Sequence, residues 1–178
     1  MKSIFTGMLL VFLNFNLDIG SSRIGLIPTF LGYIFMARGL SELTVFSSRF
    51  SKAMPVAQGM IIYSALVYAM DLFGISPMLG EYISFVLGLI TTIVYLFISH
   101  GIIMGIRDIE TMRLQNLNSD QLYSTWKLLA IFSLITYLLF LIPILAIVSI
   151  IVSLVIGVYY LCVFNKTKNL FYDNIPTY

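Results

Sequence analysis

Charged residues are scarce in this chain of 178 residues. Lys, Arg, Asp and Glu together make up 10% of the sequence, whereas soluble domains carry about 25%. Apolar and aromatic residues make up 60%, which suits a lipid bilayer better than a water-soluble core. The net charge of +2 is small, and no basic cluster with interleaved aromatic residues is present. The composition therefore predicts an integral membrane protein and argues against a nucleic-acid partner.

Cysteine and histidine are almost absent, which removes much catalytic and metal-binding chemistry. Cys162 is the only cysteine and His100 the only histidine, so neither an intrachain disulfide nor a His/Cys zinc site can form. The sequence also lacks the HExxH, P-loop, GxSxG and GxGxxG patterns of common enzymes. Cys162 lies between leucine and valine and is expected to be a small packing residue. We therefore expect no enzymatic activity, no metal and no cofactor.

Three long apolar runs, at 3–43, 55–106 and 127–164, are expected to contain the membrane-crossing helices. A crossing helix needs about 20 residues to traverse about 30 Å of hydrocarbon. The first run would be about 60 Å long as one helix, so it must break. Segment 18–23 supplies the break, because it contains two charges, a glycine and two serines. The last run must also fold back, and Pro143 marks either the turn or a kink.

The fold predicted from these breaks is an all-α, polytopic transmembrane helix bundle. It has six spans that form three helical hairpins, with five spans as the alternative, and all residues belong to one transmembrane domain. The spans are expected at about 3–18, 24–42, 55–75, 81–106, 125–142 and 143–164, and the cytoplasmic segments at 43–54, 107–124 and 165–178.

The basic residues favour six spans over five. Lysine and arginine concentrate on the cytoplasmic side of short loops. With the N-terminus inside, six spans leave only Arg23 outside, whereas five would also put Lys166 and Lys168 outside. The cytoplasmic set is then Lys2, Arg38, Arg49, Lys52, Arg107, Arg113, Lys127, Lys166 and Lys168. We expect a multi-pass membrane protein, surrounded by lipid, with both termini in the cytoplasm.

Two predicted helices end in similar sequences. Residues 33–40 and 95–102 share the pattern Tyr, apolar, Phe, two residues, a basic residue, Gly and apolar. Both copies approach the cytoplasmic face, so the repeating unit would be a helical hairpin. The third hairpin ends in Tyr159 and Tyr160 without the basic residue and glycine. Internal repeats are frequent in transporter folds, although two apolar helix ends can also match by chance.

The same residues carry a resemblance to a family. Segment 18–43, with Ile-Pro-Thr-Phe-Leu-Gly-Tyr-Ile at 27–34, resembles an uncharacterised family of small six-helix integral membrane proteins of Gram-positive bacteria. The segment from Gly101 through Glu110 to Trp126 is similar to that family's later cytoplasmic segment. Thr29 departs from the family pattern, which tends to have aspartate there. The resemblance implies a six-helix protein of the bacterial cytoplasmic membrane and no particular activity.

Charged residues near the outer ends of the spans are the main candidates for a ligand site. They are Asp18, Arg23, Asp71 and Glu81. Asp71 lies within an apolar run and shares a helical face with Ser64 and Tyr68 at i, i+4 and i+7 spacing. Three carboxylates and one arginine near one face suit the mouth of a solute or cation site. The plainer interpretation is that they end helices and stay hydrated among lipid headgroups.

His100 and the small residues allow a functional and a structural interpretation. His100, near the inner end of the fourth span, suits a proton relay or a pH sensor. Arg38 occupies the equivalent position of the repeat, which favours an interfacial role instead. Ser149, Ser153 and Gly157 share one face of the sixth span, and such stripes favour helix packing over a polar pathway.

Two functions fit these features. The first is a small-solute-binding or transport-related module, and it predicts a cavity that reaches Asp71 or Glu81. The alternative is an accessory or assembly subunit that packs against another membrane protein or against a second copy of the chain. This alternative predicts an exposed small-residue face around Gly157. The sequence slightly favours the first.

Overall fold

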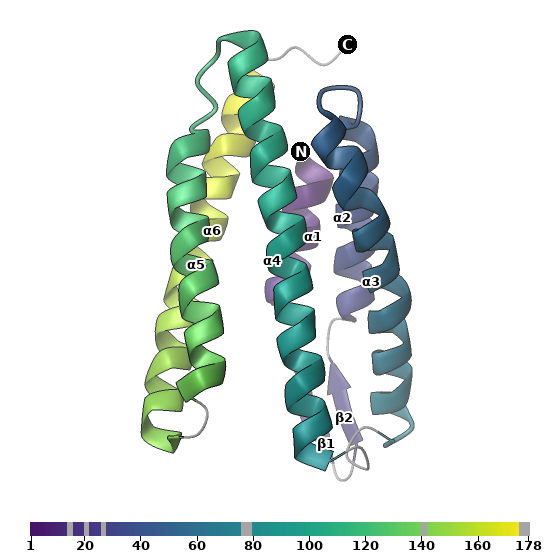
Figure 1. Cartoon of the computed structure of the whole chain (residues 1–178). Helices are drawn as coiled ribbons and strands as arrows, with labels where there is room; N and C mark the ends of the chain where they lie inside the picture. Colours follow the sequence, from purple (N-terminus) through teal and green to yellow (C-terminus); the bar gives the residue numbers. More distant parts are fainter. Residues whose placement is uncertain (14–15, 20–21, 26–27, 76–79, 140–141, 175–178) are drawn as a thin grey trace.

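A computed structural model describes residues 1–13, 16–19, 22–25, 28–75, 80–139 and 142–174. Within them the chain forms six helices and one two-stranded sheet (Figure 1). The elements are α1 (Lys2–Phe12), β1 (Asn16–Ile19), β2 (Ser22–Gly25), α2 (Thr29–Leu43), α3 (Ser48–Leu72), α4 (Gly80–Arg113), α5 (Ser119–Leu139) and α6 (Pro143–Asn174). The expectation of a six-helix fold is confirmed, but the fold is not purely helical.

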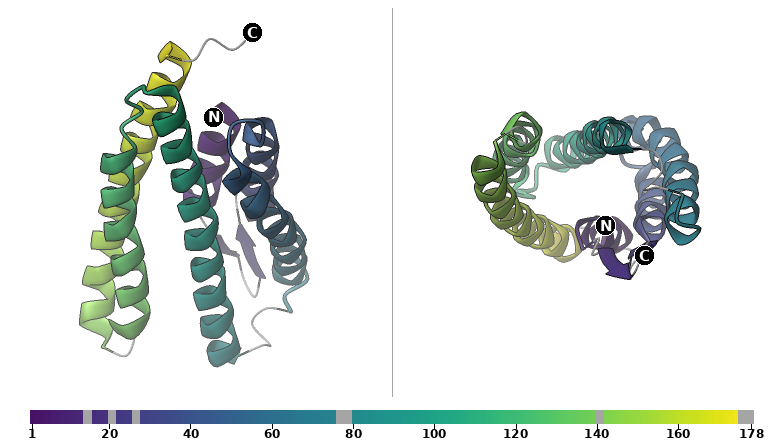
Figure 2. Two further views of the ribbon diagram at one scale, coloured as in Figure 1. Left: turned by 45° about the horizontal axis from the view of Figure 1, so that its top comes forward. Right: turned by 90° about the horizontal axis from the view of Figure 1, so that it is seen from below.

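The six helices form a ring. Each helix packs against the next along the chain, and α1 contacts α6 to close the circuit. The view along the bundle shows this arrangement, in which α1–α2, α3–α4 and α5–α6 follow one another around a central axis (Figure 2). The start of α1 and the end of α6 lie toward one end, here called the termini end (Figure 1). The opposite end carries β1 and β2 and is called the hairpin end.

Four of the helices are long and apolar enough to cross a membrane. They are Ser48–Leu72, Tyr82–Arg113, Ser119–Leu139 and Ile147–Asn174. The first two helices are shorter, with 11 residues in α1 and 15 in α2. At 1.5 Å per residue they measure about 16 and 22 Å, less than a hydrocarbon core of about 30 Å. The first two predicted spans therefore differ from the structure, since their helices end short of segment 18–23.

Strands β1 and β2 occupy the chain between the two short helices. They pair antiparallel, with Asp18 opposite Arg23 in the register. The local sequence explains the loss of helix, because Asn16, Asp18 and Ser22 have side chains that compete for backbone hydrogen bonds. The polar break recognised in the sequence is thus a strand pair and not a simple turn.

The longer helices differ from the predicted spans at their ends. α3 begins seven residues before Pro55, and the Ser47 hydroxyl caps it by accepting a hydrogen bond from the Arg49 amide at 3.2 Å. α4 continues to Arg113 and α6 to Asn174, so segments expected to be cytoplasmic extend the helices. α5 ends at Leu139 and α6 begins at Pro143, where proline suits the first turn of a helix.

The buried core lies mainly in the termini half of the ring. Its largest fully buried side chains include Tyr33, Phe50, Ile98, Ile102, Tyr160, Phe164 and Phe171. Toward the hairpin end the apolar side chains point outward instead, among them Ile62, Leu66, Ile83, Val86, Leu138, Ile147 and Ile151. An apolar exterior of this extent is costly in water and is what a lipid-facing surface presents.

Glycines bring α1 and α2 into backbone contact. A Cβ atom added at Gly7 would lie 2.5 Å from the Gly32 carbonyl oxygen, and one at Gly32 would lie 2.9 Å from the Gly7 oxygen. One added at Gly39 would lie 2.7 Å from the Ile4 amide nitrogen. Small residues permit this close approach of helices, so α1 and α2 are tightly joined.

Candidate functional site

The charged residues singled out in the sequence lie at the hairpin end. Asp18 and Arg23 are register partners on β1 and β2. Glu81 is the second residue of α4, and Asp71 lies in the last turn of α3. The structure describes Asp18, Arg23 and Glu81 by their backbone alone. Asp71 is half-buried. The strand pairing therefore brings two of these residues together, and their role in binding stays a prediction.

Tyr68 lies on α3 and packs against α2. Its ring meets that of Phe30 edge to face, with the centroids 5.8 Å apart. Tyr68 and Asp71 are not among the residues that line the central cavity described below. Both residues therefore lie outside the central cavity, and their role in binding stays a prediction.

His100 belongs to an aromatic cluster between α4 and α5. Its ring centroid lies 4.8 Å from that of Trp126 and 6.1 Å from that of Tyr123. The Trp126 indole donates a hydrogen bond to the neighbouring Ser99 hydroxyl at 2.9 Å. Lys127 Nζ lies 5.0 Å from the centre of the Tyr123 ring. The His100 ring therefore helps to join two helices, and its proton or interface role stays a prediction.

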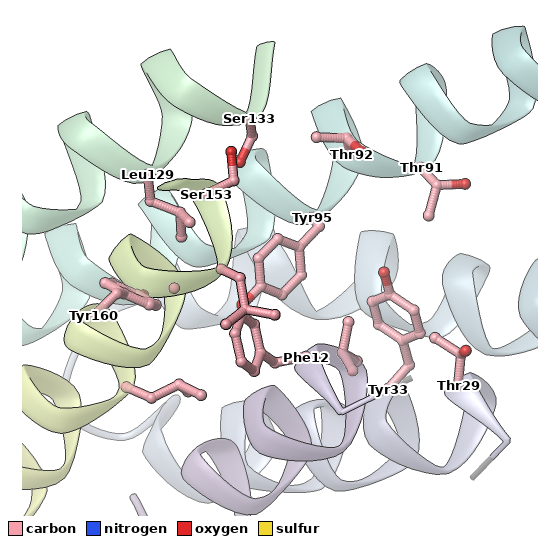
Figure 3. A pocket seen from close by; sticks show the side chains of 14 residues that line it. Phe12, Thr29, Tyr33, Thr91, Thr92, Tyr95, Leu129, Ser133, Ser153 and Tyr160 are labelled. Carbon is pink, nitrogen blue, oxygen red and sulfur yellow. The ribbon is translucent and has the colours of Figure 1, made fainter. Parts of the chain in front are cut away.

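A cavity of about 350 Å³ lies at the centre of the ring (Figure 3). Five helices contribute to the described part of its wall. The lining residues are Val11, Phe12, Thr29, Tyr33, Thr91, Thr92, Tyr95, Leu129, Ser133, Ser153, Leu154, Gly157, Tyr160 and Leu161. Small-molecule sites measure about 300–1,000 Å³, so this cavity suits a compact solute.

Hydroxyl groups dominate the polar part of the cavity wall. They come from Thr29, Tyr33, Thr91, Thr92, Tyr95, Ser133, Ser153 and Tyr160. Among the described residues of the wall, none is Asp, Glu, Lys, Arg or His. The remainder of the wall consists of apolar side chains and one glycine. The site is therefore polar without being charged, which is unlike the ionic mouth expected from the sequence.

Several of these hydroxyls are already engaged within the protein. Thr91 Oγ1 donates to the Leu87 carbonyl at 2.8 Å, and Thr92 Oγ1 donates to the Gly88 carbonyl at 3.0 Å. The Thr92 hydroxyl also lies 2.9 Å from that of Tyr137. Ser153 Oγ lies 3.0 Å from Thr136 Oγ1. These bonds fix the threonine and serine side chains on their own helices and across the α5–α6 pair.

Tyr33 differs from these residues. Its side chain is fully buried, and its hydroxyl has no hydrogen-bond partner among the described residues. Figure 3 shows the ring rising from α2 with the hydroxyl directed toward the α4 side of the cavity, where Tyr95 and Thr91 lie. An unpaired buried hydroxyl costs about 1–3 kcal/mol, and such groups are rare in native proteins. A bound molecule would remove this cost.

Three tyrosines at corresponding places in the three hairpins line the cavity. Tyr33 lies on α2, Tyr95 on α4 and Tyr160 on α6, the returning helix of each hairpin. Tyr33 and Tyr95 are the first residues of the two similar segments in the sequence, and Tyr160 belongs to the third hairpin. The tyrosine of each repeat copy, and not its basic residue, is therefore the sequence signal for the site.

The ring closes beside the cavity, where α1 meets α6. The Phe12 ring lies directly on Gly157, in space that any added Cβ atom would fill. Further along the same contact, Phe5 stacks on Phe164 with centroids 6.3 Å apart, and the Tyr160 hydroxyl points at Met8 Sδ at 3.9 Å. Gly157 is buried, so the exposed small-residue face that the accessory-subunit hypothesis predicts is covered within the chain at this position.

Comparison of the chain with protein families, with curated proteins and with solved structures finds no match.

Proposed function

We propose that this protein crosses a bacterial cytoplasmic membrane and binds a small solute in the central cavity, as a binding or transport-related module. The unpartnered hydroxyl of Tyr33 carries the proposal. It is buried in a cavity whose wall is largely hydroxyl groups, and a buried donor without a partner is stabilised when a ligand accepts its hydrogen bond.

The lengths of the elements support six crossings. Helices α3 to α6 are each long enough alone. The 11 residues of α1 and the four of β1 together measure about 30 Å, which matches the hydrocarbon thickness. Strand β2 followed by α2 has a combined length slightly greater than this thickness. In this arrangement both termini are cytoplasmic, and the hairpin end, with Arg23, faces outward.

The strand pair indicates where the solute enters. In hydrocarbon every backbone polar group must be paired within the protein, and a two-stranded sheet leaves groups unpaired at its edges. Strand β2 packs on α3, which covers one side. The remaining edge needs water to pair its backbone groups, which supports a hydrated hairpin end. The solute then reaches the cavity from outside the cell.

A thiol-labelling experiment tests whether water reaches the cavity. Ser153→Cys places a thiol on the cavity wall, and Val155→Cys places one on the outward face of the same helix, where Val155 is 60% exposed. Both are made with Cys162→Ser and reconstituted in liposomes. We expect a charged methanethiosulfonate reagent to label the cavity position alone, because thiols react as thiolates in water.

The outcome separates the two functions. Labelling of neither position would contradict a hydrated binding cavity. Purification from native membranes would then distinguish the two forms of the packing hypothesis. A stoichiometric protein partner would favour the accessory or assembly subunit. A homo-oligomer with an unlabelled cavity would favour packing between copies of the chain.

A further inference from the structure

We propose that the solute is uncharged, with a flat apolar body and an oxygen atom that accepts a hydrogen bond from Tyr33. This inference rests on the proposed function and specifies the ligand of the same cavity. It follows from three properties of the wall, which are its lack of ionised groups, its rings and the direction of its hydroxyl protons.

The described part of the wall carries no charge, which argues against an ionic ligand. None of the described lining residues has a carboxylate, an ammonium, a guanidinium or an imidazole. An ion moved from water into a site of low dielectric constant loses several kcal/mol unless an opposite charge or a dense set of dipoles replaces its hydration. Four of the wall's hydroxyls are engaged with protein atoms, as described above, so they cannot all turn toward an ion.

The rings and branched side chains shape the cavity for a flat body. Phe12, Tyr33, Tyr95 and Tyr160 contribute aromatic rings from four different helices. Tyr95 projects from α4 into the middle of the cavity, and Phe12 lies across from it (Figure 3). Leu129, Leu154 and Leu161 supply apolar contacts. Aromatic pairs prefer stacked or edge-to-face contact, so a planar apolar molecule fits between these rings.

A count of hydroxyl protons gives Tyr33 the role of donor. Each hydroxyl has one proton, and the protons of Thr91 and Thr92 go to the carbonyls of their own helix. Thr136 donates to the Phe132 carbonyl at 2.8 Å, so the bond between Ser153 and Thr136 uses the Ser153 proton. The Tyr33 proton has no acceptor among the described residues. The solute therefore supplies an acceptor oxygen, such as a carbonyl.

Three probes of nearly equal shape test the charge of the ligand. Benzamide is neutral, benzoate is an anion and benzamidine is a cation at pH 7. Binding is measured by saturation-transfer NMR on the full-length protein in lipid nanodiscs, with empty nanodiscs as the blank. We expect benzamide to bind at least ten times more tightly than either ion. Equal or tighter binding of an ion, or no binding of benzamide, would overturn the inference.

A variant pair tests the role of Tyr33. Tyr33→Phe removes only the unpartnered hydroxyl and should weaken benzamide binding roughly 2- to 10-fold. Tyr123→Phe makes the same change in the aromatic cluster with Trp126, outside the cavity, and should leave binding unchanged. Equal effects of the two variants would remove Tyr33 from the site. If Ser153→Cys is labelled but an ion binds best, the proposed function stands and only the ligand class is wrong.

Discussion

Tyr33 illustrates at the residue scale how a binding site lowers the stability of the protein that contains it. Its ring and its hydroxyl are buried out of contact with water, and the described residues supply no acceptor. A phenylalanine at this position would keep the packing and lose only the desolvated group. We therefore expect Tyr33→Phe to stabilise the unliganded protein by about 1 kcal/mol, which raises Tm by roughly 2–4 °C.

The matched control is Tyr160→Phe, which removes a hydroxyl that contacts Met8 Sδ and should give no increase. Thermal unfolding of purified protein in one detergent, followed by circular dichroism, compares the variants. A lower Tm for Tyr33→Phe than for the unmodified chain would mean that its hydroxyl is paired in the protein.

At the residue scale, charged side chains stand out in an apolar sequence, whereas the residues that line the cavity do not. A carboxylate in an apolar run, such as Asp71, is conspicuous because it is costly in lipid. Serine, threonine and tyrosine are common in membrane helices and can bond to their own backbone. Thr92 and Ser153, for example, have ordinary local partners as well as a place in the cavity. Only the arrangement of five helices reveals that these hydroxyls share one space.

At the scale of elements, the α1–α2 hairpin depends on backbone contact between two short helices. Gly7→Ala would place a methyl group 2.5 Å from the Gly32 oxygen. Backbone cannot yield as a flexible side chain does, so the helices must separate, at a cost of about 1–3 kcal/mol. We expect a Tm lower by several degrees and, since Tyr33 follows Gly32 on α2, weaker binding of benzamide.

Gly59→Ala provides the control for that change. Gly59 lies in α3, where an added Cβ atom meets nothing within 4 Å, and alanine has the higher helix propensity by about 1 kcal/mol. Its Tm should stay the same or rise. A Gly7→Ala variant as stable as Gly59→Ala would show that α1 and α2 do not approach as closely as described.

The elements that hydrophobicity alone determines were the most predictable. Helices α3 to α6 follow from the long apolar runs, and Pro143 begins α6 because proline lacks the amide that would be unpaired there. The ends of the helices were less predictable. Proline can also lie inside a helix, as Pro55 does in α3, and amphipathic segments such as 107–113 extend helices beyond the apolar run. The strand pair depends on contact with α3, which no local pattern contains.

At the scale of the whole molecule, the ring depends on one contact between the ends of the chain. Helices that follow one another pack as neighbours in any up-and-down bundle. Contact between α1 and α6, with Phe12 on Gly157 and Phe5 on Phe164, turns the series into a closed wall. This contact joins residues about 150 positions apart, so sequence periodicity cannot predict it. The central cavity exists only because the ring closes there.

The orientation of the ring gives the last prediction. With Cys162→Ser as the background, single cysteines at Arg23, Lys52 and Lys166 are treated in intact cells with a membrane-impermeant maleimide. Six crossings with cytoplasmic termini place Arg23 outside and the two lysines inside, as the excess of basic residues at the termini end favours. We therefore expect labelling of Arg23→Cys alone, and labelling of all three after the cells are opened. Labelling of both Arg23→Cys and Lys166→Cys in intact cells would indicate five crossings. Labelling of the two lysine positions without Arg23→Cys would indicate the opposite orientation, in which the hairpin end and the entrance for the solute face the cytoplasm.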